Sequence, residues 1–189
     1  MKKLILGTAI IFASSSCKSE VKKENTSQDL EVEIIKKEET RSLFIQLNEK
    51  NKSNVTGKAK FEETNGVVQM TVVVKGLSEG THAIHIHEKS DCSSDDGKST
   101  GGHWNPTAEP HGKWGAETGF HKGDIGNFMV DNNGIGAISI STDQWCIGCD
   151  DPAKNILGKA IIIHQGEDDL ISQPSGAAGA RVSCGGIIQ

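Results

Sequence analysis

The sequence predicts an all-β domain built as a sandwich or barrel of eight short antiparallel strands. From Arg41 onward, short β-rich runs alternate with Gly, Asn and Asp, and no run shows a convincing helical period. Two hairpin-type turn signals, Thr-Asn-Gly at 64–66 and Asn-Asn-Gly at 132–134, support antiparallel neighbours, because Asn and Gly tolerate positive φ. The expected strands are 43–47, 55–61, 67–75, 82–87, 126–130, 135–140, 160–164 and 181–188.

Residues 1–16 have the layout of an export signal. Lys2 and Lys3 precede an apolar run that ends at Ala13, which is too short to span a bilayer, and three serines follow. Cys17 stands where bacterial lipoproteins carry their lipid, although Ser14 replaces the usual leucine of that signal. The alternative is a secretory signal cut nearby, with Cys17 incidental. Both readings place the mature protein outside the cytoplasm, in the periplasm or at the outer membrane.

Residues 17–40 mix Lys, Glu, Ser and Asn and are expected to form a flexible, solvated tether. A helix around 30–35 is the alternative, but that segment has no evident partner face. Cleavage before Cys17 leaves 18 of the 20 basic residues against 25 acidic ones, a net charge of −7. This acidity and the low aromatic content of 4% argue against a nucleic-acid partner. A lipid anchor would be the only membrane contact.

Two long segments, residues 88–123 and 165–180, break the spacing of the expected strands. Loops of such length inside a compact domain are usually functional or disordered. The first segment contains three of the seven histidines and several carboxylates. We therefore expect it to carry part of a functional site.

All seven histidines lie between His82 and His164. In the strand 82–87, alternation places Ile84 and Ile86 on one face and His85 and His87 on the other. The same alternation in 160–164 directs His164 away from the core, so it can join them. Imidazole and carboxylate at this density indicate copper, zinc or iron rather than magnesium or calcium, which prefer oxygen ligands.

Four motifs then identify a family that residues 41–189 resemble. They are Gly76-Leu-x-x-Gly-x-His-Ala-Ile-His-Ile-His-Glu88, Gly102-His-Trp-Asn-Pro106, His121-x-Gly-Asp124-x-Gly-Asn127 and Gly179-Ala-Arg-Val-Ser-Cys-Gly185. Together they resemble the copper/zinc superoxide dismutases. The resemblance implies a Greek-key β-barrel and dismutation of superoxide, which here would protect against superoxide outside the cytoplasm.

The same resemblance implies a role for individual residues. His103 would bind both metals, and Asp168 would hydrogen-bond one ligand imidazole from each site. His82 is left over, and we expect it to pack as a structural residue near the base of the copper site. A homodimer is expected as the alternative to a monomer. The implied ligands are His85, His87, His103 and His164 for copper, and His103, His111, His121 and Asp124 for zinc.

Arg181 matches the family arginine beside copper, where a fixed guanidinium orients a small anion. Arg181 and His103 are therefore the expected catalytic residues. Since superoxide is an anion and the chain is acidic, its attraction must be local. Segment 165–180 contains no lysine, so it should offer less cationic guidance than in some family members.

The cysteines divide into two pairs once Cys17 is set aside. The resemblance implies a disulfide between Cys92 and Cys184. Cys146 and Cys149 form a C-x-x-C that lies outside the usual family pattern. We interpret it as a local disulfide, since no thioredoxin-like context surrounds it; a redox or copper-loading role is the alternative.

Two further functions remain as alternatives to the enzyme. One is a copper-buffering or copper-delivery module, which would show gaps in the copper set or lack the arginine. The other is a structural surface lipoprotein that keeps zinc alone. Since His85, His87, His103, His164 and Arg181 are all present, the enzyme is favoured.

Overall fold

The structure, a computed structural model, describes residues 39–189. The expected export signal, Cys17 and almost all of the tether lie outside the described residues. Residues 39–189 contain no α-helix, only one turn of 3-10 helix at Lys98–Thr100, and no helix there is long and apolar enough to cross a membrane. The strands are β1 (Thr40–Glu49), β2 (Thr56–Thr64), β3 (Val67–Lys75), β4 (Gly80–His87), β5 (Gly126–Val130), β6 (Ile135–Thr142), β7 (Ala160–His164) and β8 (Arg181–Gly186).

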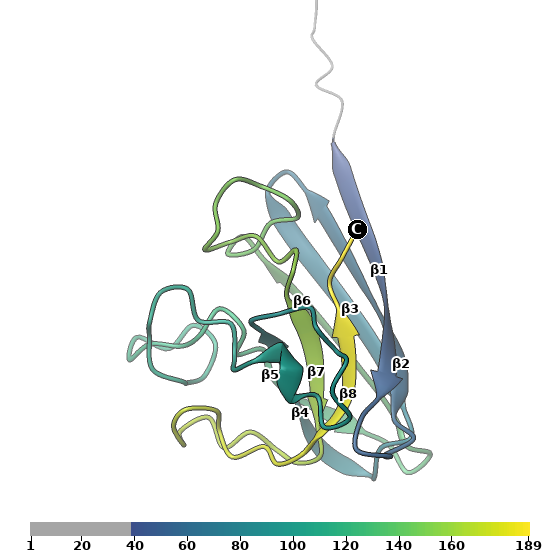
Figure 1. Cartoon of the computed structure of the whole chain (residues 1–189). Coiled ribbons are helices and arrows are strands. Elements are labelled where there is room, and N and C mark those ends of the chain that lie inside the picture. The colour runs from purple at the N-terminus through teal and green to yellow at the C-terminus, as the bar shows by residue number, and fades with distance from the viewer. Residues whose placement is uncertain (1–38) are drawn as a thin grey trace, which may run out of the picture. The chain divides into compact units, whose positions relative to one another are not determined.

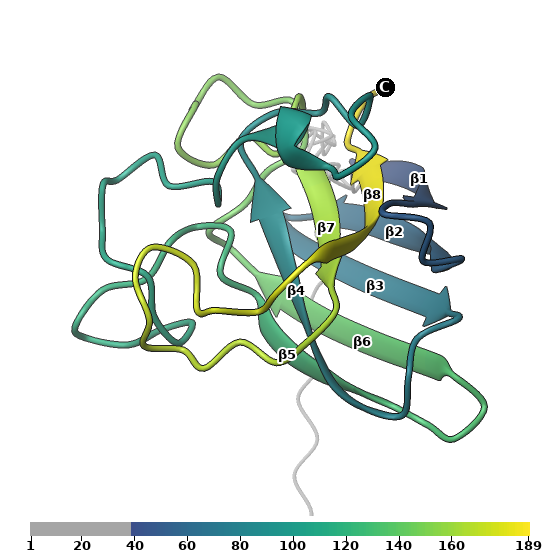
Figure 2. The same cartoon turned by 60° about the horizontal axis from the view of Figure 1, so that its bottom comes forward.

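The eight antiparallel strands form a closed barrel, as predicted, in the order β1-β2-β3-β6-β5-β4-β7-β8 (Figures 1 and 2). Because β6 and β5 lie between β3 and β4, the chain crosses over the barrel end in the Greek-key manner. The barrel closes through only two pairs, Asn48 with Cys184 and Glu49 with Ser183. The disulfide partner Cys184 therefore lies at the seam.

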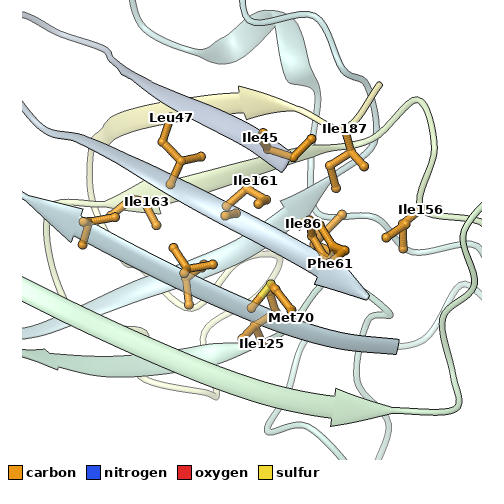
Figure 3. Close-up of a cluster of buried hydrophobic side chains, with 14 of the residues drawn as sticks. Ile45, Leu47, Phe61, Met70, Ile86, Ile125, Ile156, Ile161, Ile163 and Ile187 are labelled. Carbon is orange, nitrogen blue, oxygen red and sulfur yellow. The ribbon is translucent and has the colours of Figure 1, made fainter. Parts of the chain in front are cut away.

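Alternating residues build the core from the first three strands. In β1 the side chains of Leu43, Ile45 and Leu47 are buried and their neighbours are exposed. In β2 and β3, Phe61 and Met70 face each other across the register and are fully buried (Figure 3). Burial of each such side chain contributes about 1.5–3 kcal/mol to the free energy of folding. This packing holds the barrel rigid around the histidine-bearing strands.

The two predicted hairpin turns form, with one difference in their backbone. At the β2–β3 turn both Asn65 and Gly66 have positive φ, of 54° and 79°. At the β5–β6 turn only Gly134 does, with φ of 75°. There the side chain of Asp131 accepts bonds from the backbone of Asn133 and Ile135, so the turn closes without a left-handed Asn.

The histidine strands β4 and β7 have both faces covered, unlike β1 and β3, in which buried and exposed residues alternate. Every residue from His82 to His87 and throughout β7 is buried. Ile84 and Ile86 face the core as predicted, and the outward histidines lie beneath loops instead of facing solvent. A third long connection, the β6–β7 loop (residues 143–159), was not singled out by the sequence analysis and lies on the same side of the barrel as the other two (Figures 1 and 2).

Candidate metal centre

Strands β4 and β7 lie side by side and present histidines to one point. His85 pairs with Ile162 in the sheet register, and an irregularity between Ile163 and His164 turns the end of β7. A bulge of this kind re-aims a side chain. His103 comes from the β4–β5 loop (residues 88–125) and forms an isolated bridge with His87.

The four-histidine cluster, the set expected to bind copper, is compact. One ring nitrogen of each of its members can be chosen so that all four lie within 4.8 Å of one another. The ring centres of His85 and His103 are 4.0 Å apart, and those of His85 and His164 are 4.9 Å apart. Its members are His85, His87, His103 and His164.

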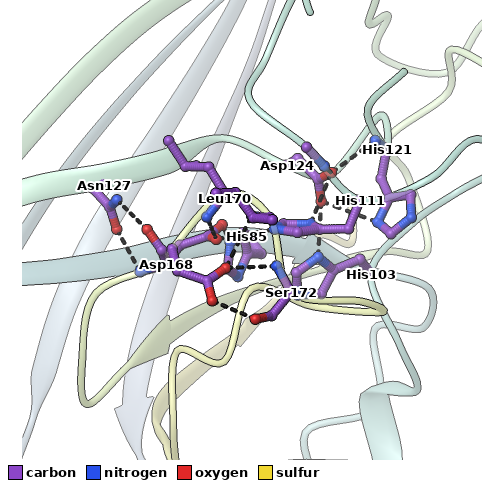
Figure 4. A network of polar contacts seen from close by, with 12 residues as sticks. His85, His103, His111, His121, Asp124, Asn127, Asp168, Leu170 and Ser172 are labelled. Atoms are coloured by element: carbon purple, nitrogen blue, oxygen red, sulfur yellow. Dashed lines mark hydrogen bonds and ion pairs between the residues drawn. The ribbon is translucent and has the colours of Figure 1, made fainter. Parts of the chain in front are cut away.

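The carboxylate cluster consists of His103, His111, His121 and Asp124 and meets the same distance condition. Its carboxylate oxygens lie 2.8 Å from His103 Nδ1, 3.0 Å from His111 Nδ1 and 3.1 Å from His121 Nδ1 (Figure 4). Ligand atoms at tetrahedral zinc, about 2.0–2.1 Å from the ion, are about 3.3 Å apart. The spacing thus fits four ligands of one ion.

Six buried ring nitrogens converge in these clusters with no hydrogen-bond partner. His111 Nδ1 and His121 Nδ1 are close to Asp124 but have no hydrogen-bonding geometry to it. A buried polar atom without a partner costs about 1–3 kcal/mol, so six in one place indicate cation ligands. They are His85 Nδ1, His87 Nε2, His103 Nε2, His111 Nδ1, His121 Nδ1 and His164 Nε2.

In five of the six rings the opposite nitrogen has a hydrogen-bond partner, which orients the ring. His85 Nε2 and His111 Nε2 donate to the two oxygens of Asp168, over 2.8 and 2.9 Å. His87 Nδ1 donates to the carbonyl of Gly101 over 3.0 Å. Such partners fix the tautomer, so that the free nitrogen offers its lone pair. Asp168 thereby joins one imidazole from each cluster.

Asp168 is itself held by a residue to which the sequence analysis gave no role. Asn127 on β5 donates to the Asp168 carbonyl and accepts from its N–H, each over 2.8 Å. Gln173 makes a similar two-way contact with the backbone of His111, over 2.8 and 2.9 Å. Asn127 appears in a quoted motif, which could have drawn attention to it, but no local pattern marks Gln173.

Burial and the carboxylates set the charges of the site. Burial lowers the pKa of His85 to about 4 and those of His87 and His164 well below their ordinary value, so these rings are neutral near pH 7. Burial also lowers the pKa of His111, but its contacts with Asp124 and Asp168 outweigh this and raise the pKa to about 9. A cation at His111 Nδ1 would compete with that proton.

Arg181 borders an opening of about 400 Å³ that is also lined by His87, His103 and His164. Its Nη1 donates to the carbonyl of Gly97 over 2.9 Å and to Thr100 Oγ1 over 3.0 Å, which anchors the guanidinium. Segment 165–180 brings no lysine, but Lys98 of the β4–β5 loop also lines the opening, 3.1 Å from Asp96. Because Asp96 lines the same opening, this ion pair adds no net charge there, and Arg181 remains the cation beside the four-histidine cluster.

Both expected disulfides are formed. Cys92 joins Cys184 across 92 residues and ties the β4–β5 loop to the last strand. Cys146 joins Cys149 across three residues, as the local-disulfide interpretation predicted.

His82 is buried outside both clusters. Its Nδ1 lies 3.1 Å from the carbonyl oxygen of His164, and its Nε2 lies 3.0 Å from that of Ser78. It thus supports the backbone beneath the four-histidine cluster, as the structural interpretation expected.

A closed Greek-key barrel with two adjacent buried imidazole clusters, joined by one shared histidine, defines a two-metal β-barrel protein. A sequence model described as copper/zinc superoxide dismutase matches residues 55–187. The chain therefore belongs to the copper/zinc superoxide dismutase family, whose two metals are the cofactors predicted from the sequence.

Individual proteins of this family and a solved structure are also similar to the chain. "Superoxide dismutase [Cu-Zn] 2" of Aquifex aeolicus is 38% identical over 138 residues, covering 70% of this chain and 79% of the relative. "Superoxide dismutase [Cu-Zn] 2" of Mesembryanthemum crystallinum is 34% identical over 140 residues, covering 70% and 86%. A crystal structure of a double mutant of a SOD-like protein from Bacillus subtilis aligns with a TM-score of 0.69 at 30% identity, covering 77% of this chain and 97% of the other.

Proposed function

We propose that this chain dismutates superoxide to dioxygen and hydrogen peroxide at a copper ion joined through His103 to a structural zinc ion. The observation that carries the proposal is the set of six buried ring nitrogens without partners, which converge as two ligand sets sharing one ring. The four-histidine cluster holds copper in this proposal, and the carboxylate cluster holds zinc. A site of three nitrogens and one carboxylate is typical of closed, structural zinc.

Copper, when bound, supplies alternate one-electron reduction and oxidation, by which one superoxide becomes dioxygen and the next becomes peroxide after taking two protons. The chain's residues supply position and protons. The anchored guanidinium of Arg181 orients the anion in the opening that it shares with three imidazoles. His103 Nε2 faces the four-histidine cluster and can hold a proton there while Nδ1 stays beside Asp124.

Asp168 acts as a positioning residue in this proposal. Its two oxygens each accept from a different ligand ring, so displacement of this one carboxylate disturbs both metal sites together. Burial raises the pKa of Asp168, but the hydrogen bonds from His111 and His85 outweigh this and hold the pKa far below its ordinary value. The carboxylate is therefore ionised and accepts both bonds throughout the neutral range.

The site of action proposed from residues 1–17 is outside the cytoplasm, with Cys17 lipidated and residues 17–40 as the tether. The charged composition of the tether and the lipoprotein-like signal of residues 1–17 support this proposal. Incorporation of labelled fatty acid by the wild-type chain and not by Cys17→Ser tests it. The homodimer stays a prediction, which sedimentation of the metal-loaded chain checks.

Metal analysis combined with a superoxide-consumption assay tests the activity. The wild-type chain should bind one copper and one zinc and consume superoxide, whereas His164→Ala should lose copper and activity while keeping zinc. Copper binding without superoxide consumption would favour a copper-delivery module, and zinc without copper would favour the structural alternative. Full activity of His164→Ala would refute the copper assignment.

A further inference from the structure

The β6–β7 loop, which carries the C-x-x-C, lies against the zinc-side segment, defined here as residues 111–124. Trp145 of the loop is 1% exposed, and its ring packs edge-on against Trp114, with centroids 5.4 Å apart. Trp114 in turn packs on Phe120 at 5.2 Å. The aromatic side chains thus connect the loop to the segment that holds His121.

Directed hydrogen bonds reinforce this packing beside a ligand. Trp145 Nε1 donates to the carbonyl of Lys122 over 2.9 Å, and Lys122 Nζ donates to the side-chain oxygen of Gln144. Lys122 directly follows His121, and Asp124 is two residues further on. The indole therefore holds the backbone between two members of the carboxylate cluster.

The backbone next to Trp145 is held firmly in turn. Cys146 is bonded to Cys149, and its backbone N–H donates to the carbonyl of Lys154 over 2.8 Å. Its carbonyl accepts from Ile156 over 3.1 Å. Ile147 and Ile156 are both buried in the barrel core, so the disulfide closes a turn that is fastened to the barrel.

No His, Asp or Glu side chains within the described residues converge with this C-x-x-C to support a copper-loading role. Within residues 39–189, His, Cys, Asp and Glu side chains converge as potential metal sites at the two clusters already described, and neither contains Cys146 or Cys149. The two sulfurs are bonded to each other. The contacts of the loop point instead toward the zinc-side segment.

We propose that Trp145, held by the turn that the Cys146–Cys149 disulfide closes, is a positioning residue that fixes the zinc-side segment at Lys122 and so slows the loss of zinc. This inference rests on the proposed zinc binding of the carboxylate cluster. Removal of the indole N–H frees the Lys122 carbonyl and leaves His121 and Asp124 on a more mobile backbone. Zinc is then released more often without any change in its ligands.

The test uses the full chain with copper and zinc, and follows zinc release to an excess of chelator. Trp145→Phe keeps an aromatic ring and removes the donor, and Cys146→Ala/Cys149→Ala removes the disulfide and keeps the donor. Zinc release should be about tenfold faster in Trp145→Phe, near the lower end of the effect of groups that support metal ligands. The disulfide variant should lie between it and wild type.

Arg41→Ala is the matched control. Arg41 Nη1 donates to the carbonyl of Ile147 over 2.7 Å, so this change loosens the same loop away from Lys122. It should release zinc at the wild-type rate. Cobalt placed in the zinc site gives a second measurement, because its visible absorption depends on ligand geometry and should change in Trp145→Phe but not in Arg41→Ala.

Wild-type zinc release and cobalt absorption in Trp145→Phe would overturn the proposal. So would equally fast release from Arg41→Ala, because general loosening of the loop would then explain the effect. Wild-type behaviour of the disulfide variant would overturn the role given to Cys146 and Cys149. If the wild-type chain itself bound no zinc, the proposed function would fail, which is a distinct result.

Discussion

The Cys92–Cys184 disulfide should stabilise the fold far more than the Cys146–Cys149 disulfide. The sequence separations are 92 and 3 residues, so the two bonds restrict the unfolded chain very differently. The chain-entropy relation assigns about 4.6 kcal/mol to the first and about 1.6 kcal/mol to the second at 25 °C. The difference, about 3 kcal/mol, depends only on the ratio of loop lengths.

Urea unfolding of two double variants measures this difference. Cys92→Ala/Cys184→Ala and Cys146→Ala/Cys149→Ala are compared with wild type after metal removal, because bound metals add their own stabilisation to the folded state. Alanine at all four positions keeps the change in side-chain volume matched. The first variant should unfold with a free energy lower than the second by about 3 kcal/mol.

The reasoning is refuted if the variant lacking the short-range disulfide loses as much stability as the other, or more. Such a result would mean that interactions in the folded state, and not restriction of the unfolded chain, determine the effect of these bonds. The long-range variant should also consume superoxide more slowly. Cys92 belongs to the loop whose Gly97 and Thr100 hold Arg181.

Three further predictions concern the site. Arg181→Ala should lower kcat/KM for superoxide about tenfold. Copper should stay bound, since Arg181 hydrogen-bonds to Gly97 and Thr100 and to none of the metal-ligand side chains. An unchanged rate at low salt would contradict its role. Asp168→Asn should weaken both metals about 10–100-fold in chelator competition, and weakening of one metal alone would contradict the bridging role. In the metal-free chain, stability should fall as pH drops from about 6.5 toward 4, because the pKa of His85 is lowered to about 4 and the unfolded chain binds the proton more readily. It should also fall as pH rises from about 6.5 through 9, because the pKa of His111 is raised to about 9 and its folded-state proton is lost. The urea midpoint should therefore be highest near pH 6.5; midpoints that fall from pH 4 to 6.5 would contradict the sign for His85, and midpoints that rise from pH 6.5 to 9 would contradict the sign for His111.

The strands were predictable because their signal is local. Alternation of buried and exposed residues in β1 and β3 follows from the two-residue period of a strand, and turn residues mark most ends. The expected strands left residues 141–159 between them, but no local pattern shows that Cys146, Ile147 and Ile156 in this connection are buried. Their burial depends on contacts with the distant strand β2, such as that of Glu63 with the Ile147 N–H.

The residue types of the site were predictable from the sequence, but the contacts that hold those residues in place were less so. The run Glu167-Asp168-Asp169 contains three acids, and no local rule selects the middle one. In the structure Asn127 holds the backbone of Asp168, and a side chain at Gly176 would collide with the Asp168 carboxylate. The selection follows from packing between segments far apart in the sequence.

The sequence by itself determined the all-β class, the histidines and carboxylates that carry the chemistry, and the family to which the chain belongs. These depend on residue type and on short spacing, which the chain carries whether or not it is folded. Only the tertiary structure decided which nitrogen of each ring is free, how Asn127 holds Asp168 between the two clusters, and that Trp145 reaches the backbone beside His121. Those features are hydrogen bonds between distant segments, and they exist only once the closed barrel has brought the three long loops together.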